Sequence, residues 1–165
     1  LIIGLIILID DGFPILFKQK RVGLNNVHFL IYKFRTMKNN TSDIPTHLIK
    51  KNSNIFTRLG PYLRKYSIDE LPQLINIIKG DIRFIGPRPA LHNQEDLIKM
   101  RTEKKIHQLI PGITGWAQVN GRDELSLSDK VKMDYYYLNN KSFMLNIWIL
   151  LLTLYKVFRA EGVAQ

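Results

Sequence analysis

The sequence has no cysteine among its 165 residues, and this absence excludes whole classes of site. Neither a disulfide nor a metal site built on thiolates is possible, and a reducing compartment is compatible with the composition. The sequence also lacks the glycine-rich phosphate loops of the Walker and Rossmann types and the nucleophile elbow of hydrolases. The histidines do not have the spacing of a metal-binding motif; they are His28, His47, His92 and His107.

Long apolar runs are also missing. A bilayer-spanning helix needs roughly 20 apolar residues, whereas residues 1–9 and 143–155 form shorter runs. Residues 1–9 lack the charged start and cleavage site of a signal peptide. We expect them to be a buried strand or helix, or the end of a longer apolar segment. The run at 143–155 predicts a helix, over 142–159, that is buried in a core or lies on a membrane surface.

Acidic residues are scarce relative to basic ones. Lys and Arg number 24 against 14 Asp and Glu, which gives a formal net charge of +10. Such a balance favours an anionic partner: nucleic acid, an acidic membrane surface or a phosphorylated small molecule. A merely solvated basic surface is the alternative. The chain is 45% hydrophobic and 23% charged, which is typical of one compact globular domain rather than a disordered segment.

A β-hairpin is predicted in the first third of the chain. Residues 15–22 and 27–34 have the pattern of strands, and Gly23-Leu24-Asn25-Asn26 between them is rich in turn residues. The polar residues 38–54 then predict an exposed connection. A further short strand is expected at Trp116–Val119.

Helical spacing of apolar residues accounts for much of the remainder. Leu71, Leu74, Ile75 and Ile78 recur at intervals of three and four, and Gly80 supplies a stop. Other helices are expected within 55–66 (interrupted near Gly60-Pro61), over 91–109, over 128–138 and over 142–159. The candidate buried positions of the helix at 91–109 are Leu97, Ile98, Met100 and Ile106.

Two adjacent carboxylates, Asp69 and Glu70, precede the helical pattern of 71–78. Ser67 and Glu70 have the spacing of a capping box, which gives Glu70 a purely structural interpretation. Pro72 leaves the start of the helix open: it begins at Ser67 with a strained first turn, or just after the two acids. In either case the two carboxylates lie at a helix start and diverge by about 100° around its axis, so they can have different roles.

Carboxylates in this position suit phosphoryl chemistry. The positive end of the helix favours the ionised form of Asp69, which a carboxylate nucleophile requires. Attack on a phosphate anion meets charge repulsion, so cations or a metal must surround the phosphoryl oxygens. Asp69, Glu70 and a phosphate oxygen could together hold Mg²⁺, which prefers hard oxygen ligands.

The sequence offers candidate cations for such a site. Arg64 lies shortly before the acidic pair, and Arg88 stands between two prolines that restrict the backbone. This frame suits an arginine that must clamp phosphate in one geometry, or a rigid surface turn. Lys33 and Arg122 leave a strand and a turn, and each taken singly is more simply a solvated charge.

Five motifs in register carry a resemblance to a known family. They are Ile31-Tyr32-Lys33-Phe34-Arg35-Thr36-Met37, Ser67-Ile68-Asp69-Glu70-Leu71-Pro72-Gln73-Leu74, Gly80-Asp81, Gly86-Pro87-Arg88-Pro89, and Pro111-Gly112-Ile113-Thr114-Gly115-Trp116-Ala117-Gln118-Val119-Asn120-Gly121-Arg122. From about residue 10 onward, the chain resembles the bacterial sugar transferases, the monotopic polyprenyl-phosphate phosphoglycosyl transferases of capsule, O-antigen, exopolysaccharide and glycoprotein synthesis.

The resemblance implies an α+β fold, mostly helical with a β-hairpin, on the cytoplasmic face of the bacterial cytoplasmic membrane. In that family an N-terminal helix enters the membrane and returns without crossing it. Residues 1–9 would be the end of this re-entrant helix, most of which is missing here, and residues 10–165 would form a single catalytic domain.

The reaction implied by the resemblance moves a sugar 1-phosphate from a UDP-sugar to polyprenyl phosphate and releases UMP. The family pattern makes Asp69 the nucleophile, which forms a phosphosugar–enzyme intermediate, and Glu70 the second catalytic acid, with Mg²⁺ bound by the pair. Lys33, Arg64, Arg88 and Arg122 match positions implicated in binding the phosphates of the substrate. Similarity to the small capsule-type members suggests a UDP-linked N-acetylamino sugar as donor.

Two other hypotheses stay open at this point. The family usually has Leu-Asp where this chain has Leu145-Asn146; if that acid holds the site or a metal, its loss would weaken activity. The chain could therefore be an inactive membrane-associated scaffold with the same fold. A basic nucleic-acid-binding module is the remaining class, although it is supported only by net charge and no binding motif is present, so we expect no nucleic-acid partner.

Overall fold

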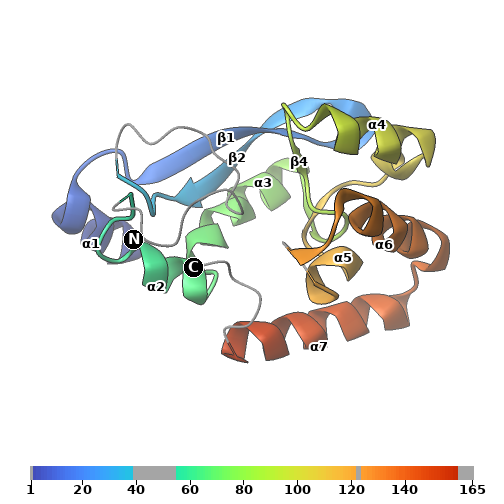
Figure 1. The fold of residues 1–165 in the computed structure, drawn as a ribbon. Coiled ribbons are helices and arrows are strands. Elements are labelled where there is room, and N and C mark those ends of the chain that lie inside the picture. Colours follow the sequence, from blue (N-terminus) through green and yellow to red (C-terminus); the bar gives the residue numbers. More distant parts are fainter. Residues whose placement is uncertain (1, 39–54, 122–123, 160–165) are drawn as a thin grey trace.

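The computed structural model describes residues 2–38, 55–121 and 124–159 (Figure 1). The predicted connection at 38–54 lies, apart from Lys38, outside the described residues, and so does the candidate residue Arg122. Short strands and a larger number of helices alternate along the chain. The α+β class is therefore confirmed.

The predicted hairpin forms the larger of two small sheets. Strand β1 (Leu16–Val22) pairs antiparallel with β2 (His28–Phe34), and one turn of 3-10 helix, η1 (Leu24–Asn26), closes the hairpin. The turn places Asn25 at a φ of 51°, a conformation that Asn tolerates better than most residues. Strand β4 (Ala90–Leu91) adds antiparallel to the other edge of β1, which leaves β2 at the edge of the sheet.

The second sheet corrects one prediction. Strand β3 (Arg83–Ile85) pairs parallel with β5 (Gly112–Thr114), while Trp116–Val119, the predicted strand, forms the single helical turn α5. The prediction was wrong because a short apolar run does not distinguish a buried strand from a buried helical turn. Three consecutive residues of α5 are buried, a pattern without the alternation of a half-exposed strand.

The acidic pair lies between two short helices. Helix α2 (Gly60–Lys65) begins with a proline in its first turn, at the point where an interruption was predicted. The 3-10 helix η3 (Ile68–Gln73) carries both acids and includes Pro72. Helix α3 (Leu74–Lys79) follows it directly and ends at Gly80, whose φ is 81°, as the stop signal predicted.

The predicted capping box is wrong. Ser67 has a φ of 54°, its side chain caps no helix, and its N–H donates instead to the carbonyl oxygen of Arg64. The side chain of Glu70 forms an ion pair with Lys33, and its N–H donates to the carbonyl oxygen of Ser67. Of the two predicted helix starts, the one at Ser67 is confirmed: Ser67 is the N-cap of η3, and the segment is a 3-10 helix as far as Gln73 before the α-helix begins at Leu74.

Helices dominate the second half of the chain. Helix α4 (Glu95–Glu103) and the 3-10 turn η4 (Ile106–Gln108) replace the single helix predicted over 91–109, which Lys105 interrupts at a φ of 59°. Helices α6 (Leu127–Asn140) and α7 (Phe143–Arg159) confirm the predictions at 128–138 and 142–159.

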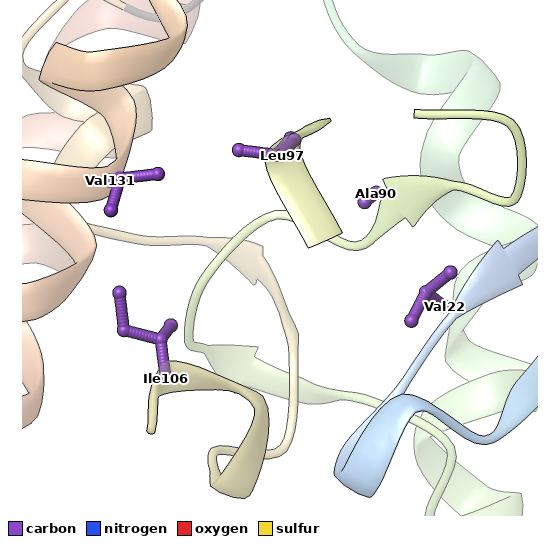
Figure 2. Close-up of a cluster of buried hydrophobic side chains, with 5 residues drawn as sticks. All are labelled: Val22, Ala90, Leu97, Ile106 and Val131. Atoms are coloured by element: carbon purple, nitrogen blue, oxygen red, sulfur yellow. The ribbon is translucent and has the colours of Figure 1, made fainter. Parts of the chain in front are cut away.

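Two buried clusters hold the elements together. The first joins β1, β4, α4, η4 and α6 through Val22, Ala90, Leu97, Ile106 and Val131 (Figure 2). Of the predicted buried positions around α4, Leu97 and Ile106 are confirmed, whereas Ile98 and Met100 are only partly buried and pack against the cluster. The second cluster joins α5, α6 and α7 through Val119, Tyr137 and Ile149.

Helix α7 lies along one side of the molecule (Figure 1). Ile149 is its only described buried residue, whereas Phe143, Trp148 and Phe158 are 80%, 53% and 83% exposed. The helix was predicted to be buried in a core or to lie on a membrane surface, and these exposures show that the first prediction is wrong. Among the described residues, no helix is both long enough and apolar enough to cross a membrane.

Candidate active site

The two carboxylates are buried beside the hairpin. Asp69 and Glu70 each have an exposed fraction of 8%, and η3 packs against β2. From β2, Lys33 donates a hydrogen bond of 2.7 Å to Glu70 Oε1, and its Nζ lies 3.9 Å from Asp69 Oδ2. The two carboxylates therefore face one ammonium group. Glu70 accepts a short hydrogen bond from this ammonium group, whereas Asp69 lies at the longest distance at which an ion pair forms.

Arg88 stands at the more open side of this pair. Its Nη2 lies 3.6 Å from Glu70 Oε1, and its side chain is 33% exposed. A guanidinium that touches a buried carboxylate and still contacts solvent can also bind an anion that arrives from solution. The structure therefore places Arg88 beside the pair.

Arg64 approaches from α2. Its guanidinium lies over the ring of Phe56, 5.3 Å from the ring centroid. Its charge lowers the pKa of Asp69, which places it within electrostatic reach of that carboxylate. The structure thus brings Lys33, Arg64 and Arg88 around Asp69 and Glu70, while Arg122 lies outside the described residues.

Burial dominates the ionisation of the site. It raises the pKa of Asp69 and the charge of Glu70 adds to this effect, while Lys33, Arg64 and Arg88 oppose it. Burial also lowers the pKa of Lys33, and Arg88 adds to that, while Glu70 and Asp69 oppose it. The sequence predicted that the helix end favours the ionised form of Asp69; in the structure, burial acts against that form and the three cations favour it.

Sequence reasoning missed Asn76, which fixes the acidic pair against the hairpin. Its side chain is fully buried, with an exposed fraction of 0%. Nδ2 donates to the carbonyl of Leu30 at 2.7 Å, and Oδ1 accepts from the N–H of Tyr32 at 3.1 Å. The amide thus occupies the free edge of β2 in the way a neighbouring strand would. The sequence signal that could have identified Asn76 is its place as a polar residue within the apolar pattern of 74–78.

Asn146, the departure from the family pattern, also has a defined place. Its Oδ1 accepts a hydrogen bond of 2.9 Å from the hydroxyl of Tyr137. Tyr137 belongs to α6 and Asn146 to α7, so this bond joins the two helices.

The oxygen donors fit a magnesium ion that is shared with a substrate. Mg²⁺ is usually bound by one or two carboxylates together with substrate phosphates. Asp69 and Glu70 supply two carboxylates that already converge on one cationic group, Lys33. The described ranges contain no group of three or more His, Cys, Asp or Glu that could hold a metal by themselves.

Comparisons with known proteins identify the family of this chain. The family described as bacterial sugar transferase matches residues 1–160 of the chain. "Uncharacterized sugar transferase EpsL" of Bacillus subtilis is 46% identical over 156 residues, which are 93% of this chain and 75% of that protein.

Two further relatives have names that state a reaction. The "UDP-glucose:undecaprenyl-phosphate glucose-1-phosphate transferase" of Escherichia coli is 35% identical, over 94% of this chain and 35% of the relative. The "UDP-N-acetylgalactosamine-undecaprenyl-phosphate N-acetylgalactosaminephosphotransferase" of Aeromonas hydrophila is 35% identical, over 96% of this chain and 39% of the relative. The chain thus spans little more than a third of these longer proteins. A match along nearly its whole length, with the acidic pair and its cations assembled in one place, shows that the chain belongs to the bacterial sugar transferase family.

Proposed function

We propose that this chain transfers a sugar 1-phosphate from a UDP-sugar to polyprenyl phosphate and releases UMP. The observation that carries the proposal is the pair of buried carboxylates facing Lys33, with the partly exposed Arg88 beside them. Two relatives are named for transfer of a sugar phosphate to undecaprenyl phosphate, which supports the same acceptor here. The step would initiate the assembly of a bacterial surface glycan.

Asp69 is the proposed nucleophile. An oxygen of its ionised carboxylate attacks the phosphorus that bears the sugar, forming an O–P bond. The bond from that phosphorus to the bridging oxygen breaks, and UMP leaves with the bridging oxygen and its electron pair. A phosphate oxygen of the polyprenyl phosphate then attacks the same phosphorus, the bond to Asp69 breaks, and the carboxylate is restored.

The cations have a distinct part in this scheme. The donor and the carboxylates are all negative, so their approach requires compensating charge. Lys33 and Arg88 neutralise Glu70, and Lys33, Arg64 and Arg88 favour the ionised form of Asp69. We assign Arg88 to the donor phosphates, because its guanidinium is partly exposed. Arg122 is assigned to the same task from the family pattern alone.

Asp69 and Glu70 are the proposed ligands of Mg²⁺. The ion would supply charge neutralisation on the phosphoryl oxygens. Lys33 lies between the two carboxylates and Arg88 beside Glu70, so these residues hold the carboxylates in place for such a ligand set.

We further propose that the chain binds the cytoplasmic leaflet of the bacterial membrane, where a polyprenyl phosphate would be found. Apolar side chains project into solvent from the segments next to the acidic pair: Leu71, Leu74 and Ile75 are 49%, 46% and 42% exposed. Helix α1 (Ile2–Asp11) adds Ile2 and Ile9, which are 77% and 79% exposed. A net charge of +10 suits anionic headgroups, each nearby Lys or Arg contributing about 1 kcal/mol.

The experiment is release of UMP by the protein in phospholipid vesicles that contain undecaprenyl phosphate. A panel of UDP-sugars, including glucose, galactose and N-acetylamino sugars, identifies the donor. We expect release with at least one donor, and none with Asp69→Asn. The matched control is Asp96→Asn, which alters an exposed acid at the start of α4 and should retain release. Full turnover by Asp69→Asn would contradict the proposed mechanism, and vesicle binding without any release would indicate a scaffold.

A further inference from the structure

The segment Pro87-Arg88-Pro89 is held by its carbonyl oxygens. Because proline has no N–H, only the middle residue of the three has a backbone donor. All three carbonyl oxygens accept hydrogen bonds from residues distant in the chain. The bonds come from the N–H of Gly112 to Pro87 at 3.0 Å, from Arg101 Nη1 to Arg88 at 2.8 Å, and from Arg21 Nη1 to Pro89 at 3.1 Å.

Arg101 is itself fixed by a second residue. Its Nε and Nη2 both donate to Asp134 Oδ2, at 3.0 and 2.6 Å. Arg101 is 8% and Asp134 1% exposed. The planar guanidinium cannot rotate without losing bonds to this carboxylate, so the direction of its remaining Nη1, toward the Arg88 carbonyl, is also fixed.

Stability alone does not account for a buried ion pair of this kind. Desolvating two charges can cost more than their attraction returns, and apolar replacements of such pairs are often neutral or stabilising. The pair joins α4 to α6, a task that apolar residues could also perform. What apolar residues could not supply is the donor to the carbonyl of Arg88.

We propose that Arg101 and Asp134 are positioning residues for Arg88. Asp134 orients Arg101, Arg101 fixes the backbone of Arg88, and the guanidinium of Arg88 is thereby held 3.6 Å from Glu70. The consequence for catalysis rests on the proposed function, in which Arg88 binds the donor phosphates. If the pair were purely structural, its loss would affect the whole fold. If it positions Arg88, its loss lowers activity through Arg88.

The test is a double-mutant cycle of Arg101→Lys and Arg88→Ala, measured as kcat/KM for UMP release. Lysine keeps a charge opposite Asp134, but one ammonium cannot reproduce the fork that bonds both partners. We expect Arg101→Lys to lower kcat/KM about tenfold when Arg88 is present, a coupling typical of residues in one network. In the Arg88→Ala background it should cause no further loss. An equal loss in both backgrounds would overturn the proposal.

Hydrogen exchange supplies a readout that needs no substrate. In Arg101→Lys, the peptide spanning residues 84–91 should exchange faster, while that spanning β2, residues 28–34, should be unchanged. Unchanged exchange at 84–91 would refute the anchoring. Because this measurement requires no transferase activity, a wild-type protein that releases no UMP would refute the proposed function and leave the anchoring to be decided by exchange.

A second variant covers the case in which Arg101→Lys does not fold. Arg21 is less buried and bonds the neighbouring carbonyl, that of Pro89. Arg21→Lys should show the same dependence on Arg88, with a smaller loss. Lys132→Met, which removes an exposed ion pair on the same helix as Asp134, should change neither kcat/KM nor exchange at 84–91.

Discussion

The ammonium of Lys33 bonds the carboxylate of Glu70 across 37 residues of sequence, at 2.7 Å. This contact ties the 3-10 helix of the acidic pair to the edge strand of the hairpin. It also leaves Glu70 fully engaged, while Asp69 next to it remains 3.9 Å from the same nitrogen. The two adjacent acids therefore have different environments. Glu70 is bonded directly by Lys33, and Asp69 lies farther from the same ammonium group.

Removing Lys33 should destabilise the protein. The Lys33 and Glu70 side chains are 16% and 9% exposed, so Lys33→Met leaves a buried carboxylate with less compensation. Breaking a buried pair from one side costs about 3–5 kcal/mol, and Arg88 should hold the loss near the lower end. Urea unfolding measures the change. Lys132→Met, which breaks an ion pair whose side chains are 72% and 44% exposed, is the control and should cost less than about 1 kcal/mol. Equal losses would show that the Lys33 contact is no stronger than a surface pair.

The raised pKa of Asp69 predicts a characteristic dependence of stability on pH. Folding favours its protonated form, so its contribution to stability is full below the unfolded pKa, near 3.8, and is lost as pH rises through the folded pKa. Asp69→Asn cannot ionise. The variant should therefore gain free energy of unfolding relative to wild type as pH rises through that window, and the difference should then level off. Urea unfolding across a pH series measures it.

Asp129 provides a control of opposite sign. Bonds from Ser126 and Lys132 lower its pKa below 3.8, so its contribution is present above the unfolded pKa and lost as pH falls through the folded one. Asp129→Asn should therefore be the less stable protein at neutral pH, with a difference that disappears in acid. A difference for Asp69→Asn that follows the same direction would show that its pKa is not raised.

Replacing the Asn76 side chain should lower the free energy of unfolding. Asn76→Ala leaves the N–H of Tyr32 and the carbonyl of Leu30 without their present partner. Both bonds are part-buried, and a hydrogen bond contributes about 0.5–1.5 kcal/mol net, so we expect a total loss of about 1–3 kcal/mol in urea unfolding. Asn139→Ala, which removes an exposed bond to the carbonyl of Tyr135, should lose far less. Similar losses for the two variants would contradict the role given to Asn76.

The exposed apolar surface near the site predicts membrane binding. Ile78 is 86% exposed, at the end of α3. Burying such a side chain contributes about 1.5–3 kcal/mol, so Ile78→Glu should weaken binding to anionic vesicles roughly tenfold or more. Co-sedimentation measures this. Val27→Glu, at a 66% exposed position beside the hairpin turn, is the control and should bind as wild type does. Equal weakening by both variants would mean that the surface around α3 has no special role.

The hairpin and most helices could be predicted because periodicity and turn residues are local signals. Residues 28–34 are largely apolar and residues 16–22 begin and end with apolar residues, on either side of a turn rich in Asn and Gly, and nothing distant overrides that pattern. The acidic pair was found for the same reason, as two adjacent residues beside a helix start. Arg64 and Arg88 were candidate cations from their places in the sequence, whereas Lys33 was assigned to the site only through the family resemblance.

Features that depend on tertiary contacts were not predictable from local pattern. Ser67 and Glu70 have the spacing of a capping box, but Glu70 bonds Lys33 instead. Trp116–Val119 is apolar enough for a strand, but its segment forms a helical turn after β5. Asn76 and Arg101 look like ordinary polar residues in helical segments; their roles arise from backbone atoms of Leu30 and Arg88 that only the folded chain brings near.

The most direct test of the central claim is the mass of the protein after incubation with its UDP-sugar donor and no acceptor. We expect an increase equal to one sugar phosphate less one water, located on Asp69 by peptide fragmentation, absent from Asp69→Asn, and removed when polyprenyl phosphate is added. UMP release by the wild-type protein with no adduct at Asp69, or with an adduct on another residue, would contradict it.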